Sequence, residues 1–419
     1  MVKINAERLL AALDEQAAIG RTPDGGLSRT SLSDADLDVR AWFAERARSG
    51  GLMVRTDGAG NQHAVFASPR PAAPTVLIGS HLDSVPNGGR FDGALGVVAG
   101  LEVALTLADV RAELPFHVEV VNFTDEEGTR LGLLGSTAMC GMLTSETLDR
   151  VRMGRVELDA ALERVGCSCD TALSARRDFS DVLAYFEAHI EQGTRLERAG
   201  DDIGVVTAIV GIHSFWLTFG GQAAHAGTRP IPDRRDAFMG AAQFAQGARQ
   251  LVLERFSPGV CNVGAVQVEP GAFNIVPASA RIAFEFRHGD PATLGAMEEA
   301  LLALARQAAD DHGLTLEITP AGGAEPALMD SRLVDIVERA AEQAGLKRQR
   351  LMSFAGHDAQ MLARVTPSVM LFVPCKDGIS HNPAEYCAPE DCVNAAQVIL
   401  NSVLLLAGSD SGAGARASH

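Results

Sequence analysis

Two apolar patterns divide the chain into an α/β part and a second, smaller unit. In the first part, residues 75–79 form a short, continuous run rich in apolar and β-branched residues, which predicts a strand buried on both faces. The other elements expected there are helices over 5–18, 34–48 and 95–107 and strands over 52–55, 63–66 and 116–123. Their β–α–β order predicts a sheet with helices on its faces.

The pattern changes after a break expected near residues 204–210. The elements expected from Ile212 onward are strands over 213–219, 261–268, 279–286 and 314–319 and helices over 233–254 and 292–312. Together they make one β-α-β-β-α-β unit, which is the ferredoxin-like arrangement. Residues 320–323, Pro-Ala-Gly-Gly, are expected to close this unit.

The chain then returns to the first pattern. The elements expected there are a helix over 331–345, a strand over 368–373 and a helix over 389–407. The sequence therefore predicts a discontinuous α/β domain, residues 1–210 and 321–407, with a smaller domain, residues 211–320, inserted into it. Residues 408–419 are rich in glycine, serine and alanine, so we expect a disordered tail.

Composition and charge narrow the classes of protein. The 419 residues are 47% apolar and 21% charged, as in ordinary globular proteins. A net charge of −17 disfavours a general nucleic-acid binder, because phosphate neutralisation needs a basic face. Seven cysteines, an odd number, favour free thiols in a reducing compartment, so we expect the cytoplasm. Charges interrupt the N-terminal helix and no apolar run reaches about 18 residues, so neither a signal peptide nor a membrane span is expected.

Most of the candidate chemistry lies where expected strands end. His81 and Asp83 follow the 75–79 strand and point the same way on extended backbone, so Asp83 could contact the back of His81 and fix its tautomer. A histidine satisfied within a loop is the alternative. Asp92 lies among glycines in 88–96, where the backbone can approach a ligand closely. An aspartate in this setting can also be a turn former or a helix cap.

Two adjacent acids, Glu126 and Glu127, follow the 116–123 strand. Such acids repel one another unless a cation or a proton intervenes, and their side chains point apart. One could bind a metal while the other faces a substrate; a solvated acidic turn is the alternative. His189 and His381 each end an apolar or small-residue stretch. Histidines and carboxylates gathered at sheet ends predict a site for two borderline divalent cations.

Eight motifs occur in the order found in one family, and they span nearly the whole chain, from about residue 20 to 407. They are H-L-D-S at 81, G-G-R-F-D-G-A-L-G at 88, D-E-E-G-T-R at 125, H-I-E-Q-G at 189, H-A-G-T at 225, R-R-D-A at 234, G-H-D-A at 356 and G-I-S-H-N-P-A-E at 378. The chain resembles the metal-dependent hydantoinase/carbamoylase amidases, within the di-zinc aminoacylase/carboxypeptidase clan. The resemblance implies an α/β/α catalytic domain of the di-zinc peptidase type with an inserted lid and dimerisation domain.

The resemblance also implies two divalent ions per chain bridged by one carboxylate. Zn²⁺ is expected, and Mn²⁺, Co²⁺ and Ni²⁺ accept the same ligands. The expected ligands are His81, Asp92 and His189 for one ion and Asp92, Glu127 and His381 for the other. Glu126 would be the general base, and Asp83 would support His81.

The residues that match the family's substrate-binding positions are Gln192, His225, Asn274, Arg287 and Gly356. Arg287 would grip a substrate carboxylate bidentately. His225 would stabilise the tetrahedral oxyanion, and in the family this lid histidine reaches the active site of the partner in a homodimer. Without the resemblance, a surface salt bridge would also explain Arg287, and a turn would explain Asn274.

The activity implied is hydrolysis of an N-carbamoyl amino acid to the amino acid, CO₂ and ammonia. Allantoate amidohydrolase is the nearest alternative, followed by an aminoacylase or dipeptidase and by an inactive metal-binding dimer. His189 disfavours the peptidases, which usually have a carboxylate in its role. Three departures from the family pattern, Ala224, Arg229 and Glu285, leave the substrate open.

Overall fold

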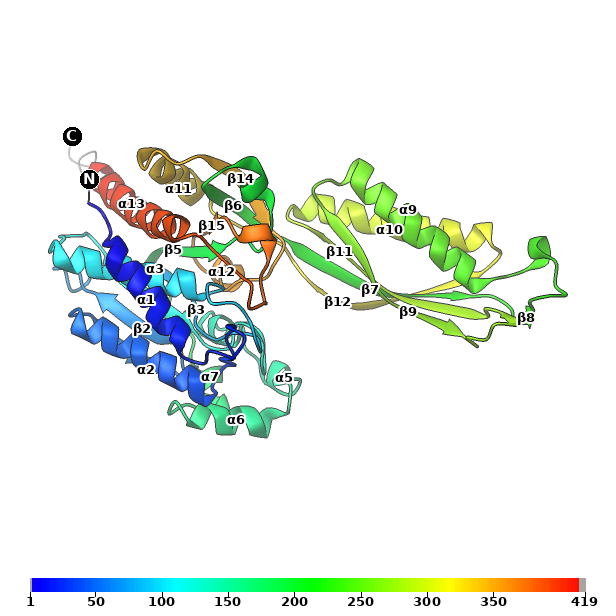
Figure 1. Ribbon diagram of the computed structural model, residues 1–419, viewed down its shortest axis with the longest axis horizontal. Coiled ribbons are helices and arrows are strands. Elements are labelled where there is room, and N and C mark those ends of the chain that lie inside the picture. Colours follow the sequence, from blue (N-terminus) through cyan, green and yellow to red (C-terminus); the bar gives the residue numbers. More distant parts are fainter. Residues whose placement is uncertain (1, 414–419) are drawn as a thin grey trace. The chain divides into compact units, whose positions relative to one another are not determined.

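The chain forms two compact units in a computed structural model that describes residues 2–413, with side chains through Gly408 (Figure 1). The first unit comprises residues 2–207, 329–351 and 355–413, and the second comprises 208–328 and 352–354. The expected inserted domain, residues 211–320, falls within the second unit.

A mixed sheet is the centre of the first unit. In spatial order its strands are β1 (Met53–Thr56), β2 (Gln62–Phe66), β4 (His117–Phe123), β3 (Thr75–His81), β5 (Val182–Ile190), β15 (Ser368–Val373), β6 (Ile203–Ile209) and β13 (Ala327–Leu328), with β14 (Arg348–Ser353) also beside β6. All seven residues of β3 are buried, as its continuous apolar run predicts.

The four central strands run parallel, so their carboxyl ends meet at one edge of the sheet. His81 at the end of β3 is in register with Phe123 of β4. His189 in β5 is in register with Phe372 of β15. Because α/β sheets place their sites at this edge, the register brings together side chains that are far apart in the sequence.

Helices cover both faces of this sheet. They are α1 (Ala6–Ala18), α2 (Asp34–Ser49), α3 (Ala94–Asp109), α8 (Arg195–Ala199), α11 (Ser331–Gln343), α12 (Ala359–Leu362) and α13 (Pro389–Ala413). Ser33 caps α2, because its side chain accepts a hydrogen bond from the backbone N–H of Asp36. Helix α3 packs on β3, β4 and β5.

Helix α13 is long and apolar enough to cross a membrane by length and composition alone. In this fold it packs against α3 and α11 and over β5 and β15, and residues such as Ile399 and Val403 are buried there. Its apolar side is therefore used by the core of the first unit.

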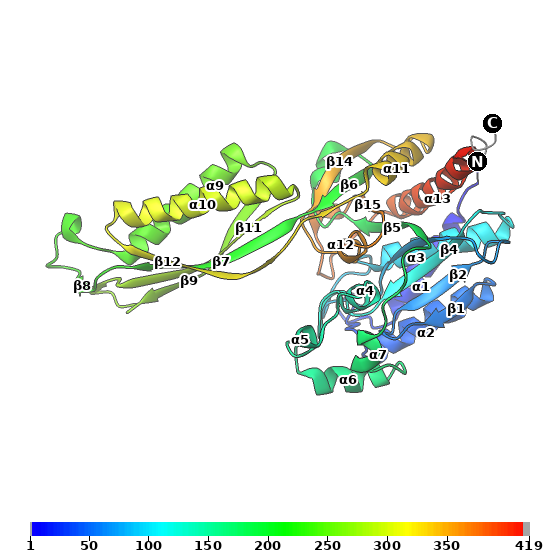
Figure 2. The ribbon, with the colours of Figure 1, turned by 180° about the vertical axis from the view of Figure 1, so that it is seen from behind.

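Four short helices between β4 and β5 were not expected from the sequence. They are α4 (Leu134–Met139), α5 (Ser145–Leu148), α6 (Arg155–Glu163) and α7 (Cys169–Leu173), which gather beside the sheet (Figure 2). Their buried side chains, among them Leu148, Leu158 and Leu162, form a separate small apolar cluster.

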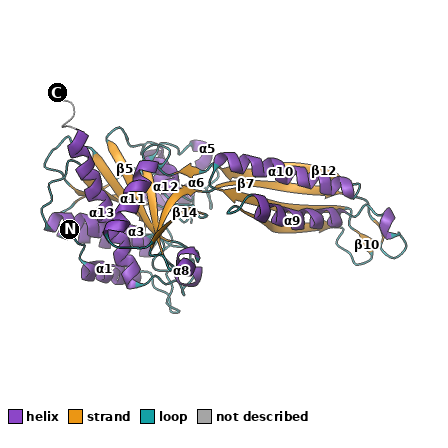
Figure 3. Ribbon diagram, turned by 90° about the horizontal axis from the view of Figure 1, so that it is seen from above, coloured by secondary structure: helices purple, strands orange, loops and turns teal. Residues whose placement is uncertain are grey.

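The second unit is an antiparallel sheet with two helices on one face (Figure 3). The strand order is β12 (Thr315–Ala324), β7 (Gly211–Gly220), β11 (Ser279–His288), β9 (Val260–Glu269), and the helices are α9 (Ala237–Arg255) and α10 (Pro291–Asp311). Phe219, Phe244 and Phe284 lie in the core between sheet and helices. The expected β-α-β-β-α-β order is present, with short strands β8 (Ala224–His225) and β10 (Ile275–Val276) added as a separate pair.

Three expected boundaries differ from the structure. The break expected at 204–210 contains the boundary between the two units at 207/208, but these residues form strand β6, which pairs with β15 and β14, rather than an interruption of the sheet. Strand β12 continues past Pro320 through an irregular register to Ala324, which an edge strand tolerates. Helix α13 continues to Ala413 rather than ending at 407, and residues 414–419 of the expected tail lie outside the described residues.

Candidate metal centre

Two groups of metal-ligating side chains share one carboxylate at the carboxyl edge of the first unit's sheet. One group is His81, Asp92 and His189, and the other is Asp92, Glu127 and His381. Within each group one ligand atom per residue lies within 4.8 Å of the others. His81 and His189 belong to strands, whereas the other three side chains come from loops that follow or precede sheet elements.

The two oxygens of Asp92 face different groups. Oδ1 lies 3.1 Å from His189 Nε2 and 3.6 Å from His81 Nε2. Oδ2 lies 3.4 Å from His381 Nε2, which is also 3.4 Å from Glu127 Oε2. This division is the geometry of a bridging carboxylate. Glu127 Oε1 is buried without a hydrogen-bond partner among the described residues, as a ligand atom would be. Imidazole and carboxylate donors suit borderline divalent ions, so these residues fit two metals.

Backbone carbonyls fix the two buried histidines from behind. His81 Nδ1 lies 3.0 Å from the carbonyl oxygen of Asp83, and His189 Nδ1 lies 2.9 Å from that of Ile190. A proton on each Nδ1 donates to its carbonyl and leaves the Nε2 lone pair on the side of the shared carboxylate, where that of His189 also accepts the backbone N–H of Gly93 at 3.1 Å.

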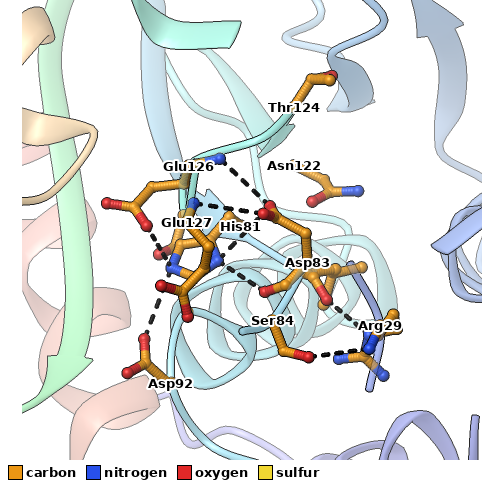
Figure 4. A network of polar contacts seen from close by, with 12 residues as sticks. Arg29, His81, Asp83, Ser84, Asp92, Asn122, Thr124, Glu126 and Glu127 are labelled. Atoms are coloured by element: carbon orange, nitrogen blue, oxygen red, sulfur yellow. Dashed lines mark hydrogen bonds and ion pairs between the residues drawn. The ribbon is translucent and has the colours of Figure 1, made fainter. Parts of the chain in front are cut away.

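Asp83 acts differently from the expectation that its side chain holds His81. Its carboxylate Oδ1 is 3.7 Å from His81 Nδ1, and its backbone carbonyl makes the closer contact. The carboxylate instead accepts hydrogen bonds from the backbone N–H groups of Glu126 and Glu127, both at 3.3 Å (Figure 4). Asp83 therefore ties the end of β3 to the Glu126–Glu127 turn.

The charges of the site depend on one another. Burial raises the pKa of Asp92, but His189, His381 and His81 outweigh burial and hold that pKa well below its usual range. Burial lowers the pKa of His189, but the adjacent Asp92 carboxylate raises it to about 9, and a hydrogen bond to Asp92 raises that of His381 to about 9. Burial lowers the pKa of His81 to about 4. Burial and the nearby Asp92 carboxylate raise the pKa of Glu127 to about 7.

Glu126 lies beside the groups without belonging to either. Its Oε2 is 3.4 Å from His81 Nε2. Burial raises the pKa of Glu126 well above its ordinary value, and the neighbouring carboxylates of Asp358 and Glu127 raise it further. A carboxylate with these surroundings can take and hold a proton near neutral pH.

The ligands line a cavity of about 260 Å³. Its other lining residues are Glu126, Leu133, Gln192, Ala355, Gly356 and His357. The side-chain amide of Gln192 donates to Asp92 Oδ2 at 2.7 Å, and its Oε1 is buried with no hydrogen-bond partner among the described residues. That oxygen is therefore available to accept an N–H from a ligand.

Three loop residues near the site have left-handed backbone. Asp125, Gln192 and His381 have φ values of 56°, 53° and 54°. Such conformations cost roughly 1–3 kcal/mol each for residues other than glycine, and they persist where the surroundings over-determine them. The site is therefore held in shape by strained loops as well as by strand ends.

The second unit holds the other expected substrate residues. His225 in β8 is in register with Ile275 of β10, and Ala226 N–H donates to the carbonyl of Asn274, so His225 and Asn274 lie close together. His225 is exposed, and its Nδ1 accepts from the backbone N–H of Gly227 and Thr228. Its Nε2 then carries the proton and can donate.

Arg287 lies near the C-terminal end of β11, and its guanidinium group contacts a carboxylate. Its Nε and one terminal nitrogen donate to Glu285 Oε1 at 3.0 and 2.8 Å, and its other terminal nitrogen donates to the carbonyl of Phe354. The salt bridge that was the alternative explanation of Arg287 is therefore present. Of the two other departures, Arg229 donates to the carbonyl of Asp233, and Ala224 lies in β8.

Sequence reasoning assigned no role to three residues near the ligands. The ring of His357 lies 4.5 Å from that of His189, and burial lowers its pKa well below the ordinary value. Ser380 and Glu385 contact Asp92 through its side chain and backbone. Both were within a recognised motif, but their hydrogen bonds reach nearly 300 residues back along the chain.

Comparison with known proteins agrees with the fold. A family model described as peptidase family M20/M25/M40 matches residues 77–404, and the chain belongs to this family. It is 37% identical to an N-carbamoyl-L-amino acid amidohydrolase of Geobacillus stearothermophilus, over 96% of this chain and 99% of that protein. It is 32% identical to a ureidoglycolate hydrolase of rice, Oryza sativa subsp. japonica, over 94% of this chain and 84% of that protein.

A solved structure supports the same conclusion. The chain matches an amidase of the hydantoinase/carbamoylase family from Burkholderia multivorans with a TM-score of 0.89 and 38% identity, over 97% of this chain and 98% of that one. The family resemblance drawn from the sequence and the α/β class of the fold are thereby confirmed.

Proposed function

We propose that the chain is a metal-dependent amidohydrolase that converts an N-carbamoyl amino acid to the free amino acid, CO₂ and ammonia. The observation that carries this proposal is the pair of ligand groups sharing Asp92, with Glu126 beside them. The relatives named N-carbamoyl-L-amino-acid amidohydrolases, at 33–37% identity over 96% of the chain, support the substrate class.

The residues of the site would divide the work as follows. His81, Asp92 and His189 would hold one divalent ion, and Asp92, Glu127 and His381 the other. Such ions lower the pKa of water and polarise a carbonyl oxygen. Glu126 would take the proton of the attacking water and pass it to the leaving nitrogen. Burial of Glu126 favours this role because it raises the group's affinity for a proton.

The residues expected from the family would divide the binding of the substrate among them. The unpartnered Oε1 of Gln192 would accept an N–H of the ureido group, and Gly356 would line the same cavity. Arg287 would bind the substrate carboxylate with donors that Glu285 does not engage. His225, with Asn274 beside it, would donate from Nε2 to the developing oxyanion.

A ureidoglycolate or allantoate hydrolase is the second candidate. Relatives named ureidoglycolate hydrolase are 31–32% identical over 94–95% of the chain. Ureidoglycolate and allantoate also combine a ureido group with a carboxylate, so the same donors and acceptors would serve them.

The metal, the oligomeric state and the cellular compartment are also part of the proposal. Zn²⁺ is the expected ion, and a homodimer in the cytoplasm is the expected form. All seven cysteines are free thiols, which suits a reducing compartment. Within the described chain, β9 and β12 each have one strand neighbour, and Phe238, Met239 and Leu253 of α9 are exposed. Such edges and apolar faces favour pairing between copies.

A substrate panel with detection of ammonia, and of the free amino acid for the N-acetyl compound, tests the proposal. It comprises N-carbamoyl-L-amino acids, N-carbamoyl-β-alanine, allantoate, ureidoglycolate and an N-acetyl amino acid. We expect turnover of at least one N-carbamoyl amino acid, abolished by chelator and restored by Zn²⁺ or Mn²⁺. Faster turnover of allantoate or ureidoglycolate would favour the second candidate, and a metal-loaded protein inert on every compound would refute both.

A further inference from the structure

Behind Asp92 lies a hydrogen-bond network that has no part in the roles above. The hydroxyl of Ser380 lies 2.7 Å from Asp92 Oδ2 and 2.9 Å from Glu385 Oε2, so it can donate to either carboxylate. The other oxygen of Glu385 accepts the backbone N–H of Phe91 at 2.8 Å and that of Asp92 at 3.1 Å. Glu385 thus holds the backbone of Asp92 directly, and its second oxygen lies beside the Ser380 hydroxyl that contacts the Asp92 side chain.

The loop before Asp92 is shaped around this carboxylate. A Cβ atom at Gly89 would lie 2.0 Å from the carboxyl carbon of Glu385 and within 2.2 Å of both of its oxygens. Glu385 is only 5% exposed, and the space that a side chain at residue 89 would need is filled by its carboxyl group. Glycine at this position lets the loop close over Glu385.

We propose that Ser380 and Glu385 are positioning residues that fix the orientation of Asp92 and thereby set the affinity for both ions. A bridging carboxylate must keep one oxygen toward each ligand group, and rotation about its Cβ–Cγ bond would destroy that division. Ser380 opposes this rotation at Oδ2, and Glu385 fixes the backbone from which the side chain projects. The inference rests on the proposed function, because it presupposes that the two groups bind metal.

The contact of Gln192 with Asp92 indicates which of the two substitutions should lower metal affinity more. Its amide also donates to Asp92 Oδ2 at 2.7 Å, so one donor remains when Ser380 is lost. Loss of Glu385 releases two backbone N–H groups and the partner of Ser380 together. Partners of metal ligands typically contribute 10–100-fold to metal affinity. We therefore expect a larger loss of affinity from Glu385→Ala than from Ser380→Ala.

The test measures Zn²⁺ binding to the metal-free full-length protein in competition with a chromophoric chelator. We expect Glu385→Ala to weaken binding by about 10–100-fold and Ser380→Ala by less. Glu385→Gln should stay close to wild type, because its carbonyl still accepts both N–H groups and its amide can donate to Ser380. Ser380→Thr keeps the hydroxyl and should also bind Zn²⁺ about as tightly as wild type. Ser174→Ala is the control, since that exposed hydroxyl donates to the carbonyl of Asp170 in the adjacent short helix and not to a residue of the site.

A double-mutant comparison addresses the mechanism. Gly89→Ala should lower Zn²⁺ affinity by displacing Glu385, and it should add little in a chain that already carries Glu385→Ala. Thermal melting of each metal-free variant checks that the fold persists. Ser380→Ala removes a single half-buried oxygen and keeps the test decidable if Glu385→Ala does not fold.

The outcomes separate the two proposals. A wild-type chain that binds no Zn²⁺ would overturn the proposed function itself. A wild-type chain that binds two equivalents, with Ser380→Ala and Glu385→Ala binding as tightly, would overturn only the positioning role. An equal loss from Glu385→Gln and Glu385→Ala would also overturn it, because the hydrogen bonds would then not be what matters.

Discussion

Glu126 and Glu127 are neighbours in the chain but have different partners. Glu127 Oε2 lies 3.4 Å from His381 Nε2, and Glu127 belongs to a ligand group. Glu126 Oε2 lies 3.4 Å from His81 Nε2, but Glu126 belongs to neither group. Asp83 holds the turn between them through both backbone N–H groups. The same residue type is thereby directed to two tasks within one turn.

Replacing each glutamate separately tests this division. Glu126→Gln should lower turnover by about 10²–10⁴-fold while both metal equivalents are kept, because general acid–base groups contribute on that scale. Glu127→Gln should lose metal as well as activity, since an amide oxygen is a weaker ligand than a carboxylate. Elemental analysis and turnover are measured on the same samples. If the two variants exchanged these behaviours, the roles within the pair would be reversed.

Arg287 offers a test of substrate charge. Arg287→Ala should cost roughly 2–4 kcal/mol in kcat/KM for substrates with a carboxylate and much less for the matching neutral amides. Arg281→Ala is a matched control, because Arg281 lies on the same face of β11 but stacks over Trp216 at 4.0 Å. Equal losses for charged and neutral substrates would show that Arg287 serves only its salt bridge with Glu285.

The residues that sequence reasoning could find are those whose type alone limits their chemistry. His81, Asp92 and His189 follow or end buried strands, and few structural roles need histidines and carboxylates there. Ser380 and Glu385 could not be assigned in this way, because their role depends on hydrogen bonds to residues about 290 positions earlier. The closer backbone contact of Asp83 with His81 was likewise hidden in the local geometry.

Among the elements, the strands of the first unit were predicted best where burial is continuous, as in β3. The four helices between β4 and β5 have four to nine residues each, too few for a clear apolar period. Strand β6 was missed because Gly204 interrupts its apolar run. A Cβ at Gly204 would lie 2.7 Å from Leu351, so the glycine lets β14 lie close beside the strand.

A cluster of charged side chains around the buried Glu119 joins strands β1, β2 and β4 of the first unit's sheet. Glu119 in β4 lies 2.6 Å from His63 Nδ1 in β2, 2.5 Å from Arg55 in β1 and 2.9 Å from Arg177. Burial raises the pKa of Glu119, but His63, Arg177 and Arg55 outweigh it and hold that pKa far below its ordinary range. The cluster therefore stabilises the fold while Glu119 is ionised.

The sign of this shift predicts how stability depends on pH. The stabilisation is fully present above about pH 4.5, the ordinary pKa of a glutamate, and is lost as the pH falls below it. Glu119→Gln should lower stability by about 3–5 kcal/mol at pH 7, because it breaks a buried ion pair. The difference in melting temperature from wild type should stay constant from pH 7 to about pH 5 and shrink as the pH falls below about 4.5. Glu113→Gln, at an exposed position, is the control, and a gap that stays constant with pH would contradict the assignment.

For the whole molecule, the expected lid residues predict cooperation between subunits. We expect His225 to act on substrate held by the metals of the other chain. His225→Ala and Glu126→Gln homodimers should each be nearly inactive. A mixed dimer has one site with an intact Glu126 and an intact His225 from the other chain, so activity should return to about half of wild type per dimer.

The mixed-dimer experiment can be interpreted only if exchange of subunits is verified. Differently tagged chains, purified through both tags after mixing, supply it. A mixed dimer with no recovered activity would mean that His225 acts within its own chain or takes no part. A chain that stays monomeric at assay concentration would exclude the arrangement altogether.

The order of strands in the first sheet has a consequence for synthesis on the ribosome. Strand β15 lies between β5 and β6 in space, yet the whole second unit is translated before it. At 5–20 residues per second, roughly 10–35 s pass between completion of β5 and the start of β15. During that interval the nascent chain presents the apolar edge of β5 without its neighbour, and His381 has not been made. The inserted unit thus delays completion of the sheet while an unpaired strand edge is open, and metal can bind its complete site only near the end of translation.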